Sequence, residues 1–346
     1  MVLLLSACAV ICICLEAGTA YFFGHLSRIE NRRETEYQKV LSIRSSRISG
    51  TESVLVAGNS LLLEGVNFPA LQQDVGPTLQ LQRTVVEGTF YLDWYYGLRR
   101  LFDVGARPDA VVLVLNPVQL TSHAIGSDYT AHFMVDRKDL FRFALDVGAD
   151  RNRLSSLVLS NFSFFYGARA EIRNWILGQL LPDLPRLSRG LRHDQKPADP
   201  ASLQELAIER LTQLRELCQQ HSANLVFVIP PANEDLGATA IARQATAQGI
   251  QVIMPIAPGE LPATDYSDGF HLNFVGAGKF TPELALGLKQ VLQPIDGIHN
   301  QSTRLSAGVS EGHSSPVSTQ IRALATTAER SPFETVQANQ GTTASK

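Results

Sequence analysis

The sequence predicts an α/β protein with a doubly wound, flavodoxin-like, mostly parallel sheet and helices on both faces. Short apolar runs of strand length alternate with segments of helical periodicity. The strand-like runs are Val54–Ala57, Ala110–Leu115, Leu225–Ile229 and Gln251–Met254. This alternation is typical of parallel sheets, because each crossover connection lays a helix against the sheet.

Composition limits the classes of function. The chain has 346 residues, 45% of them hydrophobic and 18% charged, with a net charge of -3. This is enough for a sizeable core, and the lack of basic excess argues against a nucleic-acid partner. Cys218 is the only cysteine outside the apolar N-terminus, so no disulfide framework is expected within the domain.

The N-terminus predicts a membrane anchor. Residues 1–24 are almost continuously apolar, interrupted by Glu16, and are long enough to cross a bilayer as a helix. A cleaved signal peptide is the alternative. Residues 25–50 are interpreted as a juxtamembrane linker. Its arginines Arg28, Arg32 and Arg33 would place the following domain in the cytoplasm by the positive-inside rule.

The α/β domain is expected over residues 51–296. Helices are predicted over Phe90–Val104 and from Ser202, where a capping box with Glu205 precedes an apolar stripe that includes Cys218.

Two segments depart from this alternation. Residues 118–200 are read as a helical insertion, in which 152–181 form a long stretch rich in aromatics and arginines. Packing beside the sheet is the favoured role of that stretch, and a wall of the active site or a membrane contact are the alternatives. The composition of 297–346 predicts a disordered tail.

A serine follows the first predicted strand at the position where such sheets bind ligands. The strand runs into Gly58, Asn59 and Ser60, and ligands sit outside the carboxyl ends of parallel strands. Far along the chain, Asp268 and His271 are three residues apart. An aspartate at this spacing can orient an imidazole that takes the proton of a serine hydroxyl. Ser60 is therefore either a helix cap or a nucleophile.

These motifs resemble the SGNH (GDSL-like) hydrolase superfamily. "GNSLL" at 58–62 resembles its serine block, and "DGFH" at 268–271 resembles its late Asp-x-x-His. The resemblance implies an SGNH-hydrolase-like fold with Ser60 as nucleophile, His271 as base and Asp268 as the orienting acid. It also implies an oxyanion hole made by the N–H groups of Ser60 and Gly88 and the side chain of Asn116.

Departures from the family pattern bear on function. Val114 stands where the third block usually has glycine, Pro117 follows Asn116, and Asn59 replaces the commoner aspartate. The Asn59 variant resembles membrane-anchored members associated with acylation of cell-envelope or exported polysaccharides. The resemblance implies an extracytoplasmic domain, in conflict with the positive-inside rule, so the orientation of the anchor stays open.

The expected function is that of a membrane-anchored serine esterase or O-acyltransferase acting through an acyl-serine. The expected partners are an acylated carbohydrate or other ester, the membrane, and a polysaccharide-export or acyl-donor membrane protein. The alternative is a catalytically silent module that binds polysaccharide or an assembly partner. No cofactor is expected, since no phosphate-cradling glycine loop follows a strand. No metal is expected either, since the spacing of His123, Asp128 and His132 fits no standard zinc pattern.

Overall fold

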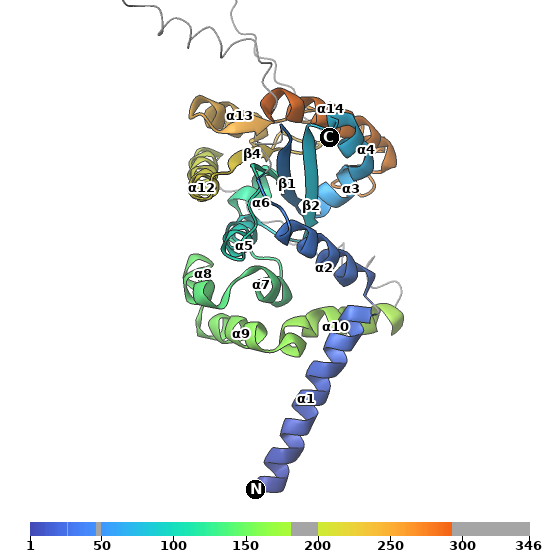
Figure 1. Cartoon of the computed structure of the whole chain (residues 1–346), viewed down its shortest axis with the longest axis vertical. Coiled ribbons are helices and arrows are strands. Elements are labelled where there is room, and N and C mark those ends of the chain that lie inside the picture. Colours follow the sequence, from blue (N-terminus) through green and yellow to red (C-terminus); the bar gives the residue numbers. More distant parts are fainter. Residues whose placement is uncertain (26, 46–49, 181–199, 293–346) are drawn as a thin grey trace, which may run out of the picture. The chain divides into compact units, whose positions relative to one another are not determined.

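The computed structural model describes residues 1–25, 27–45, 50–180 and 200–292 (Figure 1). They belong to one compact unit, Met1–Ile295. The tail predicted over 297–346 lies outside the described residues.

The sheet has five parallel strands in the order β2-β1-β3-β4-β5. The strands are β1 (Glu52–Gly58), β2 (Leu79–Val85), β3 (Ala110–Val114), β4 (Asn224–Val228) and β5 (Gln251–Ile253). This is the flavodoxin-like order, so the predicted fold class is confirmed. Strand β2 was not predicted, because Gln80, Gln82 and Arg83 break its apolar run. It is an edge strand, where polar side chains are tolerated.

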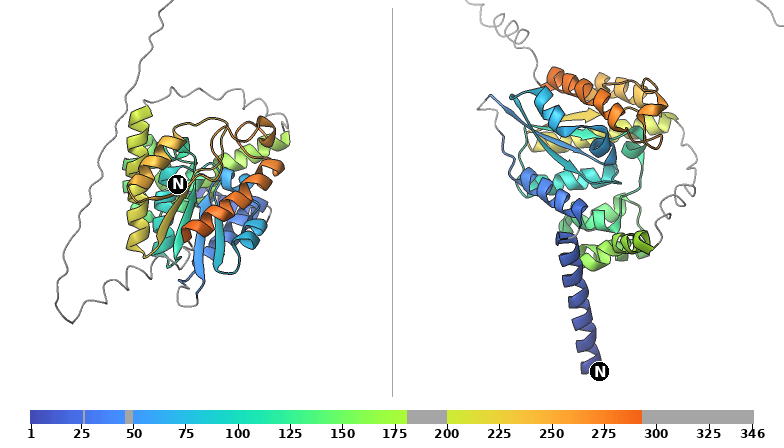
Figure 2. Two further views of the ribbon diagram at one scale, coloured as in Figure 1. Left: turned by 90° about the horizontal axis from the view of Figure 1, so that it is seen from above. Right: turned by 90° about the vertical axis from the view of Figure 1, so that its right-hand side faces the viewer.

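Helices cover both faces of the sheet (Figure 2). Val54, Val56 and Val112 point into a core shared with α3 (Ser60–Gly65), α4 (Phe68–Val75) and α14 (Phe274–Leu292). Leu55 and Leu113 point into the opposite core, shared with α5 (Tyr91–Asp103), α12 (Pro200–Gln220) and α13 (Ala238–Ala247). Because both sides of each inner strand are buried, the strands read as continuous apolar runs rather than as alternating patterns.

The helical predictions need two corrections. Helix α12 begins at Pro200, so Ser202 lies inside the helix and the predicted capping box is wrong. A proline fits this position because the first helical residue needs no N–H donor. The stretch 152–181 is not one helix but two, α9 (Arg151–Phe162) and α10 (Phe164–Leu180). The chain is extended at Ser163, whose hydroxyl caps α10 by accepting the N–H of Tyr166 at 3.0 Å.

The described part of the insertion is built from short helices. They are α6 (Pro117–Thr121), α7 (Asp128–Met134), the 3₁₀ turn Arg137–Asp139, α8 (Leu140–Asp146), α9 and α10. In α12, the predicted apolar stripe is buried at Ala207, Leu211, Leu214 and Cys218, so Cys218 is inside the core. Burial raises the pKa of the Cys218 thiol to about 12, which keeps it unreactive.

The N-terminal helix α1 (Val2–His25) is long and apolar enough to cross a membrane. Within 25–50, the expected juxtamembrane linker, residues Arg28–Leu41 form helix α2, which Ser27 caps. Helix α2 packs along the edge strand β2, where the Glu36 carboxylate accepts the backbone N–H of Val85 and pairs with Arg83. The helix thereby shields the open edge of the sheet, which would otherwise present unpaired backbone groups.

The Glu36 contact generates a prediction about stability. Glu36→Ala leaves the Val85 N–H and the Arg83 guanidinium without their buried acceptor, so the free energy of unfolding should fall by about 1–3 kcal/mol. Denaturant unfolding of the full chain in detergent measures this. Glu34→Ala, an exposed position on the same helix, is the control and should change stability by less than about 0.5 kcal/mol. Equal stability of the two variants would contradict a role for Glu36 in holding the edge.

Candidate active site

Ser60 lies at the topological switch point of the sheet. Strand β1 pairs with β2 on one side and β3 on the other, so the chain order reverses around it. The strand ends at Gly58, and Asn59 caps α3, which begins at Ser60. A side chain at Gly58 would meet Leu62 Cβ and the Val114 carbonyl oxygen, each at 3.0 Å. The tight turn that presents Ser60 therefore requires a glycine before it.

The three residues predicted as a triad lie together. His271 Nε2 is 3.0 Å from Ser60 Oγ, across 211 residues of sequence. His271 Nδ1 is 2.9 Å from Asp268 Oδ2. Because the carboxylate accepts a hydrogen bond from Nδ1–H, the neutral ring has its lone pair on Nε2, facing the serine hydroxyl. The structure thus places Ser60, His271 and Asp268 in a hydrogen-bonded series, and this arrangement can transfer a proton from Ser60 to His271. Their catalytic roles stay predictions.

The loop that carries Asp268 and His271 is held by its own backbone. Asp268 Oδ1 accepts the N–H groups of Phe270 and His271 at 3.0 and 2.8 Å. Gly269 between them has φ +81°, a conformation that favours glycine. Asn233, from the loop after β4, donates its side-chain amide to the Gly269 carbonyl at 2.7 Å. The loop is thus fastened both to itself and to the end of a neighbouring strand.

The electrostatics of Asp268 suit an orienting acid. Partial burial works to raise its pKa, but hydrogen bonds from the His271 backbone and ring and from the Phe270 backbone outweigh it and lower the pKa to about 2. Asp268 is therefore ionised at neutral pH. An ionised carboxylate at Nδ1 stabilises the imidazolium that forms when His271 takes a proton.

Gly88 and Asn116 lie at the same edge of the sheet as Ser60. Gly58 pairs with Val85 of β2 and with Val114 of β3, so the residues just after each strand share one edge. Gly88 is exposed, with φ +69°. Asn116 is 3% exposed and caps α6, where its Oδ1 accepts the Gln119 N–H at 2.8 Å. That contact fixes the orientation of the Asn116 amide and leaves its Nδ2 group as the donor for a ligand. Their oxyanion roles stay predictions.

Asn59 has a structural reason to be asparagine. It is completely buried, its Oδ1 accepts the Leu61 N–H, and its Nδ2 donates to the Thr89 carbonyl at 2.9 Å. An ionised aspartate has no donor for Thr89. The amide therefore ties the serine turn to the loop that contains Gly88.

Two supports of the Gly88 loop were not predicted. Trp94 Nε1 donates to the Thr89 hydroxyl at 2.9 Å. Asp93 Oδ2 accepts the N–H groups of Phe90 and Gly126, while its Oδ1 is buried without a partner among the described residues. The sequence did carry a signal for the role of Asp93. It is the one carboxylate among the aromatics of "YLDWYY", near the start of a helix, where an acidic side chain caps the backbone N–H groups.

The residues weighed as a metal site are occupied by other contacts. Asp128 pairs with Arg169 and Arg153. The His132 ring bonds the Ser160 carbonyl oxygen at 2.8 Å, and the His123 ring contacts Arg210 at 3.3 Å.

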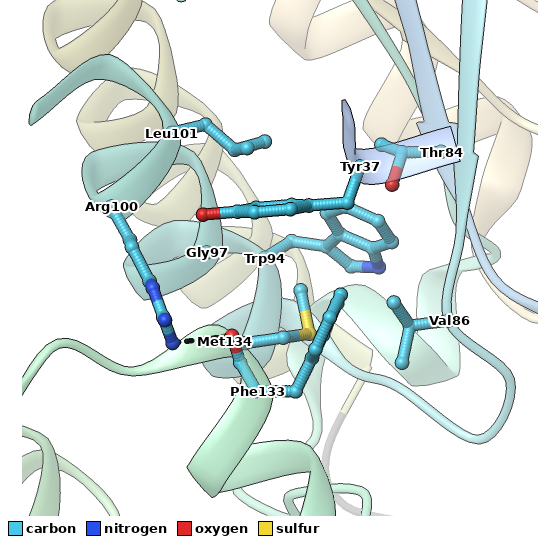
Figure 3. A pocket seen from close by; sticks show the side chains of 9 residues that line it. All are labelled: Tyr37, Thr84, Val86, Trp94, Gly97, Arg100, Leu101, Phe133 and Met134. Carbon is cyan, nitrogen blue, oxygen red and sulfur yellow. Dashed lines mark hydrogen bonds between the residues drawn. The ribbon is translucent and has the colours of Figure 1, made fainter. Parts of the chain in front are cut away.

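A small hollow has none of the triad residues in its lining. It is lined by residues of α2, β2, α5 and α7, including Tyr37, Trp94 and Met134 (Figure 3). Its volume of about 20 Å³ is that of a single water molecule. It cannot hold an organic substrate.

Comparisons with known proteins add little about chemistry. The sequence matches no protein-family model and no curated protein. Among solved structures, the chain is similar to the crystal structure of TesA, with 12% identity, coverage of 69% of this chain and 99% of the TesA chain, and a TM-score of 0.32. Because both identity and TM-score are low, the chemistry of the site rests on its own residues.

Asp93 generates a prediction about pH. Burial raises its pKa to about 7, against the opposing hydrogen bonds from Phe90 and Gly126. A carboxyl whose pKa is higher in the folded than in the unfolded state stabilises at low pH, and this stability is lost as pH rises from about 4 to about 7. Each pKa unit corresponds to about 1.4 kcal/mol.

Asp93→Asn keeps the acceptor and removes the charge, so it should abolish this decline and raise stability at pH 8 relative to the wild type. Denaturant unfolding between pH 4 and 8 measures it. Asp74→Asn, an exposed carboxylate on α4, is the control and should follow the wild-type profile. An Asp93→Asn variant that loses stability in parallel with the wild type would contradict the assignment.

Proposed function

We propose that this chain is a membrane-anchored serine esterase or O-acyltransferase of the SGNH type. The observation that carries the proposal is the hydrogen-bonded series Ser60–His271–Asp268 at the carboxyl edge of the sheet. A serine, a histidine and an ionised aspartate in this order form the minimal apparatus for acyl transfer through an acyl-serine.

The first half-reaction follows from the geometry. Ser60 Oγ attacks the ester carbonyl carbon while its proton passes to His271 Nε2, and Asp268 stabilises the resulting imidazolium. The carbonyl oxygen becomes an oxyanion, for which the N–H groups of Ser60 and Gly88 and the Asn116 Nδ2 are the proposed donors. Collapse of the tetrahedral intermediate breaks the ester C–O bond, and the leaving alkoxide takes the proton from His271 Nε2.

The second half-reaction decides between hydrolase and transferase. Water or a sugar hydroxyl attacks the acyl-serine, giving up its proton to His271, and Ser60 leaves with that proton restored. A sugar outcompetes water only when a groove positions it. The inserted aromatics are not available for such a groove as a set, because Phe164 and Trp175 pack against α1. Following the acetyl group by mass, with and without candidate oligosaccharides, distinguishes acetylated sugar from acetate.

Retention of α1 as an anchor is supported by its contacts. Phe23 is 6% exposed and packs with Tyr129 and Phe164 of the insertion. A cleaved signal peptide does not contribute to the mature core. Cleavage after the apolar segment would remove these contacts, and this favours a retained anchor over a cleaved signal peptide.

The orientation proposed is extracytoplasmic, in line with the family resemblance. Two of the three arginines that favour a cytoplasmic domain have structural partners: Arg33 pairs with Glu87 at 2.7 Å, and Arg32 pairs with Glu87 and Glu36. The presence of these two is thus explained without a topological signal. An acyl ester of a cell-surface or exported polysaccharide is the proposed substrate, and it rests on the resemblance of the Asn59 variant to polysaccharide-acylating members.

The rival function is a catalytically silent module that binds polysaccharide or an assembly partner. The altered third block, with Val114 and Pro117 around Asn116, favours it. The two functions differ in whether Ser60 is nucleophilic.

Covalent labelling of Ser60 separates the two functions. The full chain in detergent should react with a fluorophosphonate probe. Ser60→Ala should abolish the labelling, because the substitution removes only the hydroxyl group that attacks the probe. Intact-mass measurement reads the adduct. Ser155→Ala, an exposed serine on α9, should label like the wild type. Folded wild-type protein that stays unlabelled would favour the silent module.

The proposed oxyanion role of Asn116 is tested by the kcat of its variants. Asn116→Ala should lower kcat for an ester substrate by about 10²–10³-fold, the usual loss for one oxyanion donor. It should also cost about 1 kcal/mol of stability, because the side chain caps α6.

Two variants separate the functional from the structural effect. Asn116→Asp keeps the capping oxygen and lacks the donor, so its kcat should fall at least as far. Asn67→Ala removes the matching cap of α4 and should lose similar stability with unchanged kcat. A kcat for Asn116→Asp equal to that of the wild type would reduce Asn116 to a cap.

A further inference from the structure

Glu16, the one charged residue within 1–24, contacts the inserted helix α10. Its carboxylate accepts hydrogen bonds from the Ser163 hydroxyl and from the N–H groups of Phe164 and Phe165, the latter two at 3.0 and 3.2 Å. These are the unsatisfied donors of the first turn of α10. A carboxylate there is also favoured by the positive end of the helix dipole. Glu16 thus holds the start of α10 at a fixed position along α1.

Aromatic contacts extend this attachment toward the end of α1. Phe23 packs edge-on against Phe164 with ring centroids 5.3 Å apart, and Phe22 packs in the same way against Trp175 at 4.8 Å. Helix α10 crosses the C-terminal third of α1, and the rest of α1 continues beyond it (Figure 1). The position of α10 relative to α1 is therefore set by polar and apolar contacts together.

Glu16 lies within the part of α1 that is long enough to span a bilayer. Helix α1 has 24 residues, about 36 Å at 1.5 Å per residue, against a hydrocarbon core about 30 Å thick. Glu16 stands about 13 Å from the end of the helix at His25. With α1 centred in the bilayer, the start of α10 lies about 10 Å below the hydrocarbon boundary, within the depth at which interfacial helices lie.

The surface of α9 and α10 suits that depth. Large apolar side chains remain uncovered on these two helices: Leu159 49%, Phe162 66%, Trp175 51%, Ile176 45% and Leu180 70% exposed. Trp175, Ile176 and Leu180 continue the helical stripe of Ile172, which packs near Phe23. Soluble surfaces rarely leave such a group uncovered.

A hollow on α10 has a lining that suits a lipid molecule. It has a volume of about 250 Å³ and is bordered by Phe165, Arg169, Ile172, Arg173, Ile176 and Leu177. Arg169 is held by its ion pair with Asp128, which leaves Arg173 as the candidate partner of a phosphate headgroup beside apolar walls that suit an acyl chain. An arginine near a membrane surface extends its charged end toward the headgroups while its stem stays in apolar surroundings.

Resting on the proposed membrane anchor α1, we propose that α9 and α10 form a second membrane contact beside it, lying in the bilayer interface with Phe162, Trp175, Ile176 and Leu180 against lipid. Lipid covers this apolar surface, because Glu16 holds the start of α10 at a position along α1 that lies inside the bilayer. The contact also removes Glu16 from lipid, since its carboxylate faces the backbone donors of α10 and not the acyl chains. The catalytic unit is thereby held at the membrane by two attachments.

The two tryptophans of the chain allow a direct test. Trp175 lies on the proposed surface, whereas Trp94 is 1% exposed in the core. The full chain is placed in phosphatidylcholine nanodiscs with bromine either near the headgroup end or near the methyl end of the acyl chains. We expect bromine near the headgroup end to quench the larger part of the Trp175 emission. That emission is the difference between the wild type and Trp175→Phe.

The Trp175→Phe variant is the matched control. It retains only Trp94, whose emission should not change between brominated and ordinary lipid. Quenching of Trp175 by aqueous iodide, but not by brominated lipid, would place it in solvent and overturn the proposal. Quenching by neither reagent would show that protein covers the surface, through a second copy or a partner, and would overturn it as well. None of these readings depends on Ser60, so they are independent of the proposed esterase activity.

Discussion

The pairing of strand β1 between β2 and β3 is the constraint on which the candidate site depends. Parallel pairing aligns the carboxyl ends of neighbouring strands, so Ser60, Gly88 and Asn116 all follow strands at one edge. The reversal of strand order at β1 opens the space outside that edge to a ligand. The loop with His271 approaches the same edge from the far end of the chain and closes the hydrogen-bonded series on Ser60.

Buried polar groups give this edge its rigidity. Asn59 joins the serine turn to the Gly88 loop, Trp94 holds Thr89, and Asp93 joins that loop to the start of the insertion at Gly126. Each of these groups is costly to bury without a partner, so the loops can adopt few other arrangements. Loops held this firmly can supply fixed donors to a developing oxyanion, which is where electrostatic preorganisation acts.

The same loop is connected to the apolar N-terminal helix α1. Glu87, next to Gly88, pairs with Arg32 and Arg33 of α2, the helix that follows α1. Arg33 also lies over the ring of Tyr129, which packs with Phe23 at the end of α1. Contacts therefore run without a break from the proposed transmembrane segment to the proposed oxyanion loop. This continuity is compatible with the proposed function, in which the ester is presented at the membrane.

The sequence by itself determined the fold class, four of the five strands of the described sheet, the apolar N-terminal segment, and the candidate residues Ser60, His271 and Asp268. These features depend on local chemistry: apolar runs, helical spacing, a Gly-Asn-Ser turn, and an Asp-x-x-His motif. Strand β2, the break at Ser163 and the capping of α10 by Glu16 were decided only by the tertiary structure. Each of these depends on partners distant in sequence, since α2 shields the polar edge strand and Glu16 lies 147 residues before Ser163. Local pattern carries no information about such partners, because the free energy that selects them arises only when the segments pack together.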